Sequence, residues 1–147
     1  MNLNRTLTAT VYVINNNRVL LHMHKKHKSL FPLGGHMEPE ELPHETAIRE
    51  VYEESGLDIE IYNDEEKLEL GRVRQLHRPM NILLENIGHP IENIDFIYFA
   101  TTNESKVQPQ AGESKELYWM SREEVINNSN IQPHIVSMAL KALDVVK

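Results

Sequence analysis

Three glutamates, Glu50, Glu53 and Glu54, have the spacing of neighbours on one face of a helix. Residues three and four positions apart on a helix carry Cβ atoms about 5–6 Å from one another, so the three carboxylates would converge. At an effective dielectric constant of about 20, two unit charges about 5 Å apart repel by roughly 3 kcal/mol. A divalent cation would turn this repulsion into binding. Carboxylate oxygens without a His or Cys partner favour Mg²⁺ or Mn²⁺ over zinc.

The same acidic segment has a second interpretation, a helix face exposed to solvent. Acidic residues crowd residues 38–69, where Arg49 and Lys67 are the only Lys or Arg residues. Arg49 could pair there with Glu45 or Glu53, each four residues away. The helix alone leaves both interpretations open.

Residue spacing on both sides of the helix favours the metal site. Starting at Gly35, five residues precede Glu41 and seven more precede Arg49-Glu50. An aliphatic residue, a Glu-Glu pair, a glycine and a final aliphatic residue, Leu57, follow in that order. Residues 35–57 resemble the complete sequence box of the Nudix hydrolases.

The resemblance implies a fold and a reaction. The expected fold class is α/β, a Nudix-type α/β/α sandwich with a mixed, twisted sheet. The expected reaction is Mg²⁺-dependent hydrolysis of a diphosphate linkage in a nucleoside triphosphate or another nucleotide derivative, in which a glutamate accepts the proton of a metal-activated water. By the same resemblance, Glu50 and Glu54 are expected as direct metal ligands, Glu53 as a ligand or a water-orienting residue, and the Gly34 carbonyl as a further ligand.

The remaining box residues have roles that elementary chemistry suggests. Glu41 lies near the start of the helix, where a carboxylate suits the positive end of the helix dipole and can hold Arg49. Arg49 can then orient the glutamates that face the metal and the water. Gly34 and Gly35 carry no Cβ, so the backbone can pass close to a metal or a phosphate.

Other candidate site residues lie outside the box. Members of the family often recruit a carboxylate before the last strand, and we expect Glu113 rather than Glu116 to join the catalytic residues; for both, an ordinary loop acid is the alternative. Basic side chains that could contact substrate phosphates beside Gly35 are His24, Lys26, Arg72 and Arg74. A solvated turn or an exposed strand is the simpler interpretation of each.

Composition restricts the remaining functions. The chain has 147 residues, which suits one domain over 1–147, and its net charge of −7 disfavours binding to DNA. The absence of cysteine excludes disulfides and thiolate zinc sites, and His22 and His24 lack a third ligand at zinc spacing. The first apolar stretch, residues 9–14, is too short for a signal or membrane segment. We expect a cytoplasmic enzyme that takes a small nucleotide and has no membrane partner, with a homodimer left open.

The elements that must position these residues can also be predicted. Pro43 and Gly56 suit the two ends of a helix over residues 42–55. Strands are predicted at 6–14, 19–23, 68–76, 94–101 and 117–120, loops at 24–35 and 79–90, and a helix at 135–146 after a capping box that begins at Ser121. The nearly continuous apolar run 94–101 indicates a strand covered on both faces, hence helices on both sides of the sheet.

Two other functions are compatible with the sequence. An enzyme acting on the pyrophosphorylated 5′ end of RNA is disfavoured by the acidic charge. A nucleotide-sensing module without catalysis would be indicated by a degenerate box, which this chain does not have. The substrate itself is not predicted, because Val73 stands about sixteen residues after the box, where two subfamilies carry proline or tyrosine.

Overall fold

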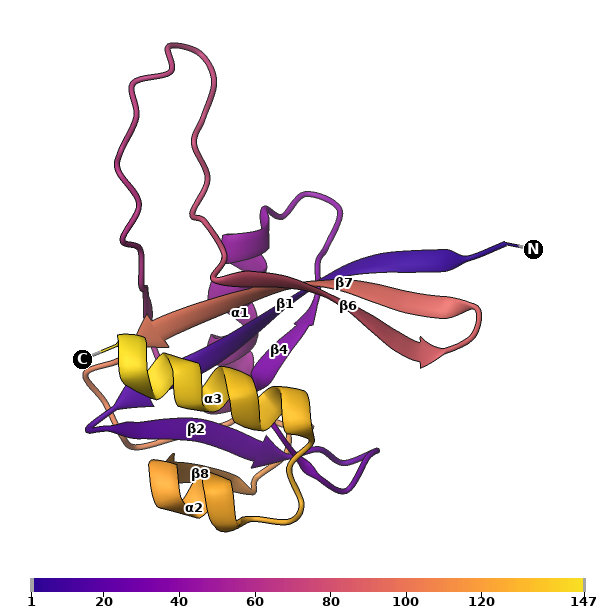
Figure 1. The fold of residues 1–147 in the computed structure, drawn as a ribbon, viewed down its shortest axis with the longest axis vertical. Coiled ribbons are helices and arrows are strands. Elements are labelled where there is room, and N and C mark those ends of the chain that lie inside the picture. Colours follow the sequence, from indigo (N-terminus) through magenta and orange to yellow (C-terminus); the bar gives the residue numbers. More distant parts are fainter. Residues whose placement is uncertain (1, 147) are drawn as a thin grey trace.

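The computed structural model describes residues 2–146. The chain forms a mixed sheet between helices (Figure 1). In chain order the elements are β1 (Asn4–Asn15), β2 (Arg18–Met23), β3 (Leu30–Phe31), β4 (Leu33–His36), α1 (Pro43–Ser55), β5 (Glu60–Ile61), β6 (Asn81–Gly88), β7 (Ile91–Thr101), β8 (Leu117–Ser121), α2 (Arg122–Asn127) and α3 (Pro133–Val145).

The long strand β1 organises the sheet. β7 runs parallel to β1, while β2 and β4 pair antiparallel with different parts of its other edge. β5 and β6 pair antiparallel with β7, and β8 pairs antiparallel with β2. The turn between β1 and β2 has φ angles of 51° at Asn16 and 60° at Asn17. Asparagine tolerates this left-handed conformation, which a two-residue type I′ hairpin requires at both central positions.

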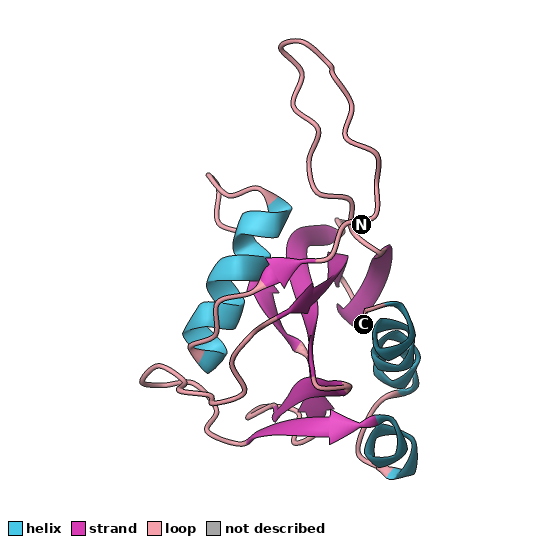
Figure 2. Cartoon of the chain, turned by 90° about the vertical axis from the view of Figure 1, so that its left-hand side faces the viewer, coloured by secondary structure: helices cyan, strands magenta, loops and turns pink. Residues whose placement is uncertain are grey.

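Helices cover both faces of the sheet, α1 on one face and α2 with α3 on the other (Figure 2). Alternate residues of the central strands serve the two cores. Val11 and Tyr98 pack in the core that includes α1 residues, whereas Tyr12 and Phe99 pack in the core that includes α3 residues. This arrangement confirms the predicted α/β/α sandwich and explains the apolar run 94–101.

Helix α1 begins and ends where the sequence indicated. Pro43 occupies its first turn, and Gly56 ends it with φ 75° and a hydrogen bond from its N–H to the carbonyl of Tyr52 (2.8 Å). Ala47 and Val51 are fully buried against the sheet. Their burial sets the orientation of the helix, and its acidic face lies toward β4.

Most predicted elements are confirmed, with small shifts at their ends. The strands at 6–14, 19–23, 94–101 and 117–120 correspond to β1, β2, β7 and β8, and the helix at 135–146 corresponds to α3. The capping box that begins at Ser121 is present, since its Oγ accepts from the Glu124 N–H at 3.2 Å and its N–H donates to Glu124 Oε1 at 2.9 Å.

Three predictions about the sheet are wrong. Residues 68–76 form no strand but part of a long loop, because no neighbouring strand is available to pair with them. The predicted connection over 79–90 contains β6, an edge strand whose outward side chains Ile82 and Leu84 are 59% and 61% exposed. The outward positions of an edge strand are usually polar, so these aliphatic residues obscured the alternating pattern by which the strand could have been predicted. The loop over 24–35 contains β3 and the first part of β4.

Candidate functional site

The two glycines of β4 face the acidic side of α1. The Gly34 N–H donates to Glu54 Oε1 at 2.8 Å. A Cβ built on Gly35 would lie 2.3 Å from Glu50 Oε2, whereas one on Gly34 would lie 2.3 Å from the carbonyl oxygen of Ala9 in β1. Gly35 therefore makes room for a carboxylate, and Gly34 makes room for the neighbouring strand. The sequence suggested that both glycines make room for a metal or a phosphate. The close approach of β1 is sufficient to explain the glycine at position 34.

Arg49 connects the start of α1 to its acidic face. Its guanidinium donates to both carboxylate oxygens of Glu41, at 2.5 and 2.9 Å, as the sequence suggested. It also donates to Glu50 Oε1 at 3.2 Å and to Glu53 Oε1 at 3.1 Å. The Glu41 contact holds the pKa of Arg49 above its usual range and lowers the pKa of Glu41 to about 2. Arg49 is thus a fixed cation that orients two of the three glutamates.

Burial is the main influence on the pKa values of Glu50 and Glu54. The pKa of Glu54 is raised to about 8, chiefly by burial, although the Gly34 N–H opposes the shift. The pKa of Glu50 is raised to about 7 by burial, against the attraction of Arg49. The negative charge of Glu113 contributes to both shifts. These carboxylates hold protons that a cation could replace.

His22 is a neutral neighbour of Glu54. Its Nε2 lies 4.0 Å from Glu54 Oε2, and both side chains are about nine-tenths buried. Burial, together with the charge of His24, lowers the pKa of His22 to about 4. The contact is therefore between a neutral imidazole and a carboxyl group, not an ion pair at neutral pH.

The glutamates fit a divalent cation in chemistry, although they are not gathered around one. Within residues 2–146 no three His, Asp or Glu side chains already form a ligand set. Glu50 and Glu53 are turned toward Arg49, while Glu54 Oε2 makes no hydrogen bond within the described chain. Oxygen donors, two raised pKa values and the clearance at Gly35 together suit a hard cation such as Mg²⁺.

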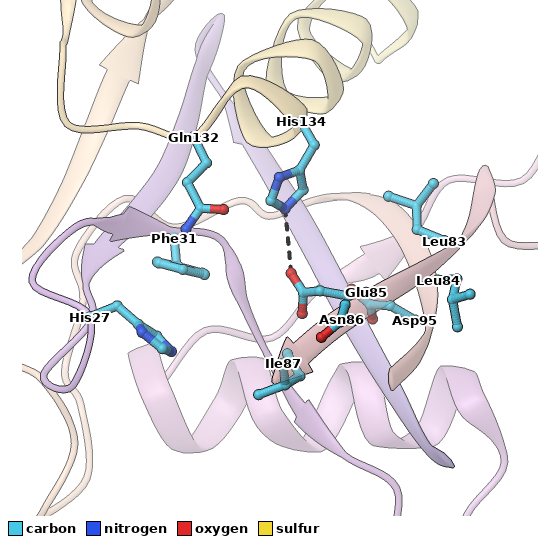
Figure 3. A pocket seen from close by; sticks show the side chains of 10 residues that line it. All are labelled: His27, Phe31, Leu83, Leu84, Glu85, Asn86, Ile87, Asp95, Gln132 and His134. Carbon is cyan, nitrogen blue, oxygen red and sulfur yellow. Dashed lines mark ion pairs between the residues drawn. The ribbon is translucent and has the colours of Figure 1, made fainter. Parts of the chain in front are cut away.

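A cleft of about 500 Å³ begins at this acidic face. One end is lined by Gly34, Gly35 and His36 of β4, by Glu54 of α1 and by residues from two loops, His24, Lys26 and Glu113. The other end is lined by residues that come from β3, β6, β7 and α3, and several of these residues also line the adjoining pocket drawn in Figure 3. Among them are Phe31, Glu85, Asp95 and His134.

The far end of the cleft combines aromatic and polar side chains. The rings of His27 and Phe31 are stacked with centroids 5.5 Å apart. Glu85 Oε2 lies 3.6 Å from His134 Nε2, the contact marked in Figure 3. Asp95 is mostly buried and accepts hydrogen bonds from the hydroxyl groups of two threonines, Thr8 (3.0 Å) and Thr10 (2.7 Å).

The structure separates the candidates outside the box. Glu113 lines the cleft, whereas Glu116 is exposed and accepts from the Tyr118 hydroxyl at 3.3 Å. His24 and Lys26 line the cleft, but Arg72 and Arg74 are exposed on the loop over 62–80 and line none of its walls. The side chains at the far end, Phe31, Glu85, Asp95 and His134, were missed, because no local motif marks them.

Comparison with known proteins assigns the chain to a family. A family model described as the NUDIX domain matches residues 4–139. The chain belongs to the Nudix family. No protein with a curated description matches at a significant level. Members of this family hydrolyse nucleoside diphosphate derivatives, so the protein is an enzyme that acts on phosphoric anhydrides.

Solved structures support the assignment. A hydrolase of the NUDIX family from Clostridium perfringens is 41% identical and superimposes with a TM-score of 0.87, covering 99% of this chain and 100% of that one. A MutT protein from Methanosarcina mazei Go1 is 15% identical, with a TM-score of 0.73 over 98% of this chain and 96% of the other. A UDP-X diphosphatase is 13% identical, with a TM-score of 0.70 over 98% and 65%. The last two share the fold alone. None of the helices within residues 2–146 has the length and hydropathy needed to span a membrane.

Proposed function

We propose that this Nudix hydrolase cuts a diphosphate linkage in a nucleoside triphosphate or another nucleotide derivative, with Mg²⁺ or Mn²⁺ as cofactor. Glu50, Glu54 and Glu53 would hold the cation, and the Gly34 carbonyl would complete the set. The observation that carries the proposal is the pairing of two desolvated carboxylates, Glu50 beside Gly35 and Glu54 beside Gly34. Both glycines and Glu54 line one end of a nucleotide-sized cleft. When bound, the cation neutralises phosphate charge and lowers the pKa of a water.

The protein's own residues position the reacting groups. Arg49 holds the carboxylates of Glu50 and Glu53, and Glu113 lines the cleft from the loop before β8. One of Glu53, Glu54 and Glu113 accepts the proton of the attacking water. The water oxygen then bonds to phosphorus as the bridging P–O bond breaks, and the leaving phosphate departs with the bond electrons.

The loop over residues 24–28 would receive the substrate phosphates. Lys26 lies at the cleft beside Gly35, while burial lowers the pKa of His24, so Lys26 supplies the positive charge. The Lys25 ammonium donates to the Gly112 carbonyl and ties this loop to the one that carries Glu113. Arg72 and Arg74 are not proposed as substrate contacts because they lie away from the cleft.

The far end of the cleft would hold the nucleoside. The stacked His27 and Phe31 rings offer a wall for a planar base, and Glu85 and Asp95 offer acceptors for its N–H groups. A cleft with a phosphate end and an aromatic end suits a free nucleotide.

The test is hydrolysis of a substrate panel with either Mg²⁺ or Mn²⁺. Nucleoside triphosphates, nucleotide sugars, dinucleoside polyphosphates and triphosphorylated RNA would be compared at equal concentration. We expect turnover of at least one free nucleotide and none in EDTA. If RNA alone is cleaved, the free-nucleotide substrate is wrong. If no compound is cleaved with either metal, catalysis itself is wrong.

A further inference from the structure

Residues 62–80 form an arm that extends away from the sheet and helices (Figures 1 and 2). Its tip is a tight turn in which the Val73 N–H donates to the Leu70 carbonyl at 3.1 Å. Gly71 has φ 63° in this turn, a conformation that favours glycine. The turn divides the arm into an outgoing limb, residues 63–69, and a returning limb, residues 72–79.

The side chain of Gln75 joins the two limbs. Its Oε1 accepts from the Leu68 N–H at 2.8 Å, and its Nε2 donates to the carbonyl of Glu66 at 3.0 Å. At the root of the arm, Arg78 pairs with Asp64. The arm therefore has a defined shape without any strand.

The outer half of the arm carries four exposed aliphatic side chains. The exposed fractions are 47% for Leu68, 42% for Leu70, 62% for Val73 and 39% for Leu76. Isolated exposed aliphatic residues are common on protein surfaces, but a cluster on a projecting segment indicates contact with another molecule.

The limbs of the arm carry opposite charges. The outgoing limb holds all four acidic residues of the arm, Asp64, Glu65, Glu66 and Glu69, with a single cation, Lys67. The returning limb holds Arg72, Arg74 and Arg78 without any acid. Arg78 is paired at the root, but within residues 2–146 no ion pair includes Glu66, Glu69, Arg72 or Arg74. Unpaired charges of both signs thus lie side by side near the tip.

The root of the arm meets a second exposed surface on α1. The rings of His77 and His44 contact each other with centroids 4.8 Å apart. Ile48 and Tyr52 follow His44 at four-residue intervals on the same helix face and are 41% and 49% exposed. A stable interface needs about 20–30 residues on each side. The arm and this stripe of α1 together approach that size.

We infer that the arm docks face to face with the same arm of a second copy of this chain. A two-fold axis parallel to the arms lays the acidic limb of each over the basic limb of the other, so one surface is complementary to itself. The two sets of unpaired charges then neutralise each other, and the leucines and Val73 are covered. This homodimer is independent of the proposed hydrolysis.

Charge reversal in the full-length chain tests the arrangement. Variant A carries Glu66→Lys and Glu69→Lys, and variant B carries Arg72→Glu and Arg74→Glu. Each variant alone places like charges opposite each other, so we expect its dimer dissociation constant to rise by about tenfold or more in sedimentation velocity. An equimolar mixture of A and B should restore the dimer, because unlike charges face again. Circular dichroism checks that each variant is folded.

Two further variants complete the test. Glu104→Lys with Lys106→Glu changes exposed charges away from the arm and should leave the dimer intact. Val73→Asp, at the most exposed apolar position of the arm, should weaken the dimer without any change to the paired charges. A wild-type chain that sediments as a monomer at all concentrations overturns the inference. So does a dimer that variants A and B leave unchanged, or a mixture of A and B that stays monomeric.

Discussion

Gly35 and the Glu50 carboxylate occupy adjacent space: a Cβ on Gly35 would lie 2.3 Å from Glu50 Oε2. Gly35 has no left-handed φ, so Gly35→Ala strains no backbone and acts only by displacing that carboxylate. We expect kcat to fall by about tenfold or more, since small displacements of a ligand are costly. The control is Gly71→Ala, which has open space but φ 63° and should lower stability by about 1 kcal/mol while activity persists. Equal activity in Gly35→Ala and the wild type would show that Glu50 is not a ligand.

Glu54→Gln should lower kcat by at least about 10²-fold and leave the protein folded, because it removes a proposed metal ligand. The glutamine can still accept the hydrogen bond from the Gly34 N–H, which is 2.8 Å long in the wild type. The contact between β4 and α1 is therefore kept. Steady-state kinetics and thermal unfolding in EDTA measure the two effects separately. Glu40→Gln, an exposed position without a proposed role, is the matched control. Near-normal turnover of Glu54→Gln would mean that the ligand set is wrong.

Metal binding should depend on pH through the same carboxyl groups. In the folded, metal-free protein the pKa of Glu54 is about 8 and that of Glu50 about 7, both above the ordinary value of 4.5. A raised pKa means that the folded state holds protons the unfolded state releases, so these groups lower stability progressively from about pH 4.5 to about pH 8. Bound Mg²⁺ would replace these protons and remove the loss of stability at higher pH.

The difference in Tm between Mg²⁺ and EDTA should therefore grow from pH 5.5 to pH 8, as followed by differential scanning calorimetry. Comparing the two conditions at each pH cancels the titration of groups outside the site. Glu54→Gln should reduce the difference. A Tm difference that is absent, or constant across this range, contradicts a metal site at Glu50 and Glu54.

The box could be predicted because its parts are local. Arg49 and the three glutamates lie on one helix, and Glu41 lies two residues before that helix begins, so a short stretch of chain brings them together. The Arg49 contact with Glu53 follows directly from their four-residue spacing. Their roles at a metal remain predictions.

The far end of the cleft could not be predicted because pairing between distant segments creates it. Glu85 lies on β6, which the sequence did not reveal as a strand, and it meets His134 only because β6 pairs with β7 below α3. The prediction for Arg72 and Arg74 was wrong for the opposite reason, because a local pattern suggested a strand that does not form. Their alternating pattern suggested a strand at the site, but no strand pairs with these residues and the arm carries them away.

Arg49→Lys should impair the enzyme although the charge is kept. The guanidinium contacts both oxygens of Glu41 and also Glu50 and Glu53, and a single ammonium cannot reproduce this planar fork. We expect the free energy of unfolding to fall by about 1–3 kcal/mol, since a partly buried charge-assisted network is left incomplete. The drop in kcat should exceed any change in KM because Arg49 does not line the cleft. Chemical denaturation and steady-state kinetics provide both readouts, and a rise in KM alone would assign Arg49 to substrate binding.

Glu113 and Glu116 lie in the same loop but differ in their surroundings. Glu113 lines the cleft with Glu54, and its charge raises the pKa of that residue, so the two carboxyl groups face the same space. Glu116 faces solvent and accepts from the Tyr118 hydroxyl. Glu113→Gln should lower kcat by about tenfold or more and raise the Mg²⁺ concentration needed for half-maximal activity. Glu116→Gln should stay within about twofold of the wild type, because a surface hydrogen bond of this kind contributes little. If both substitutions are silent, Glu113 is an ordinary loop acid, and the proton acceptor must be Glu53 or Glu54 on α1.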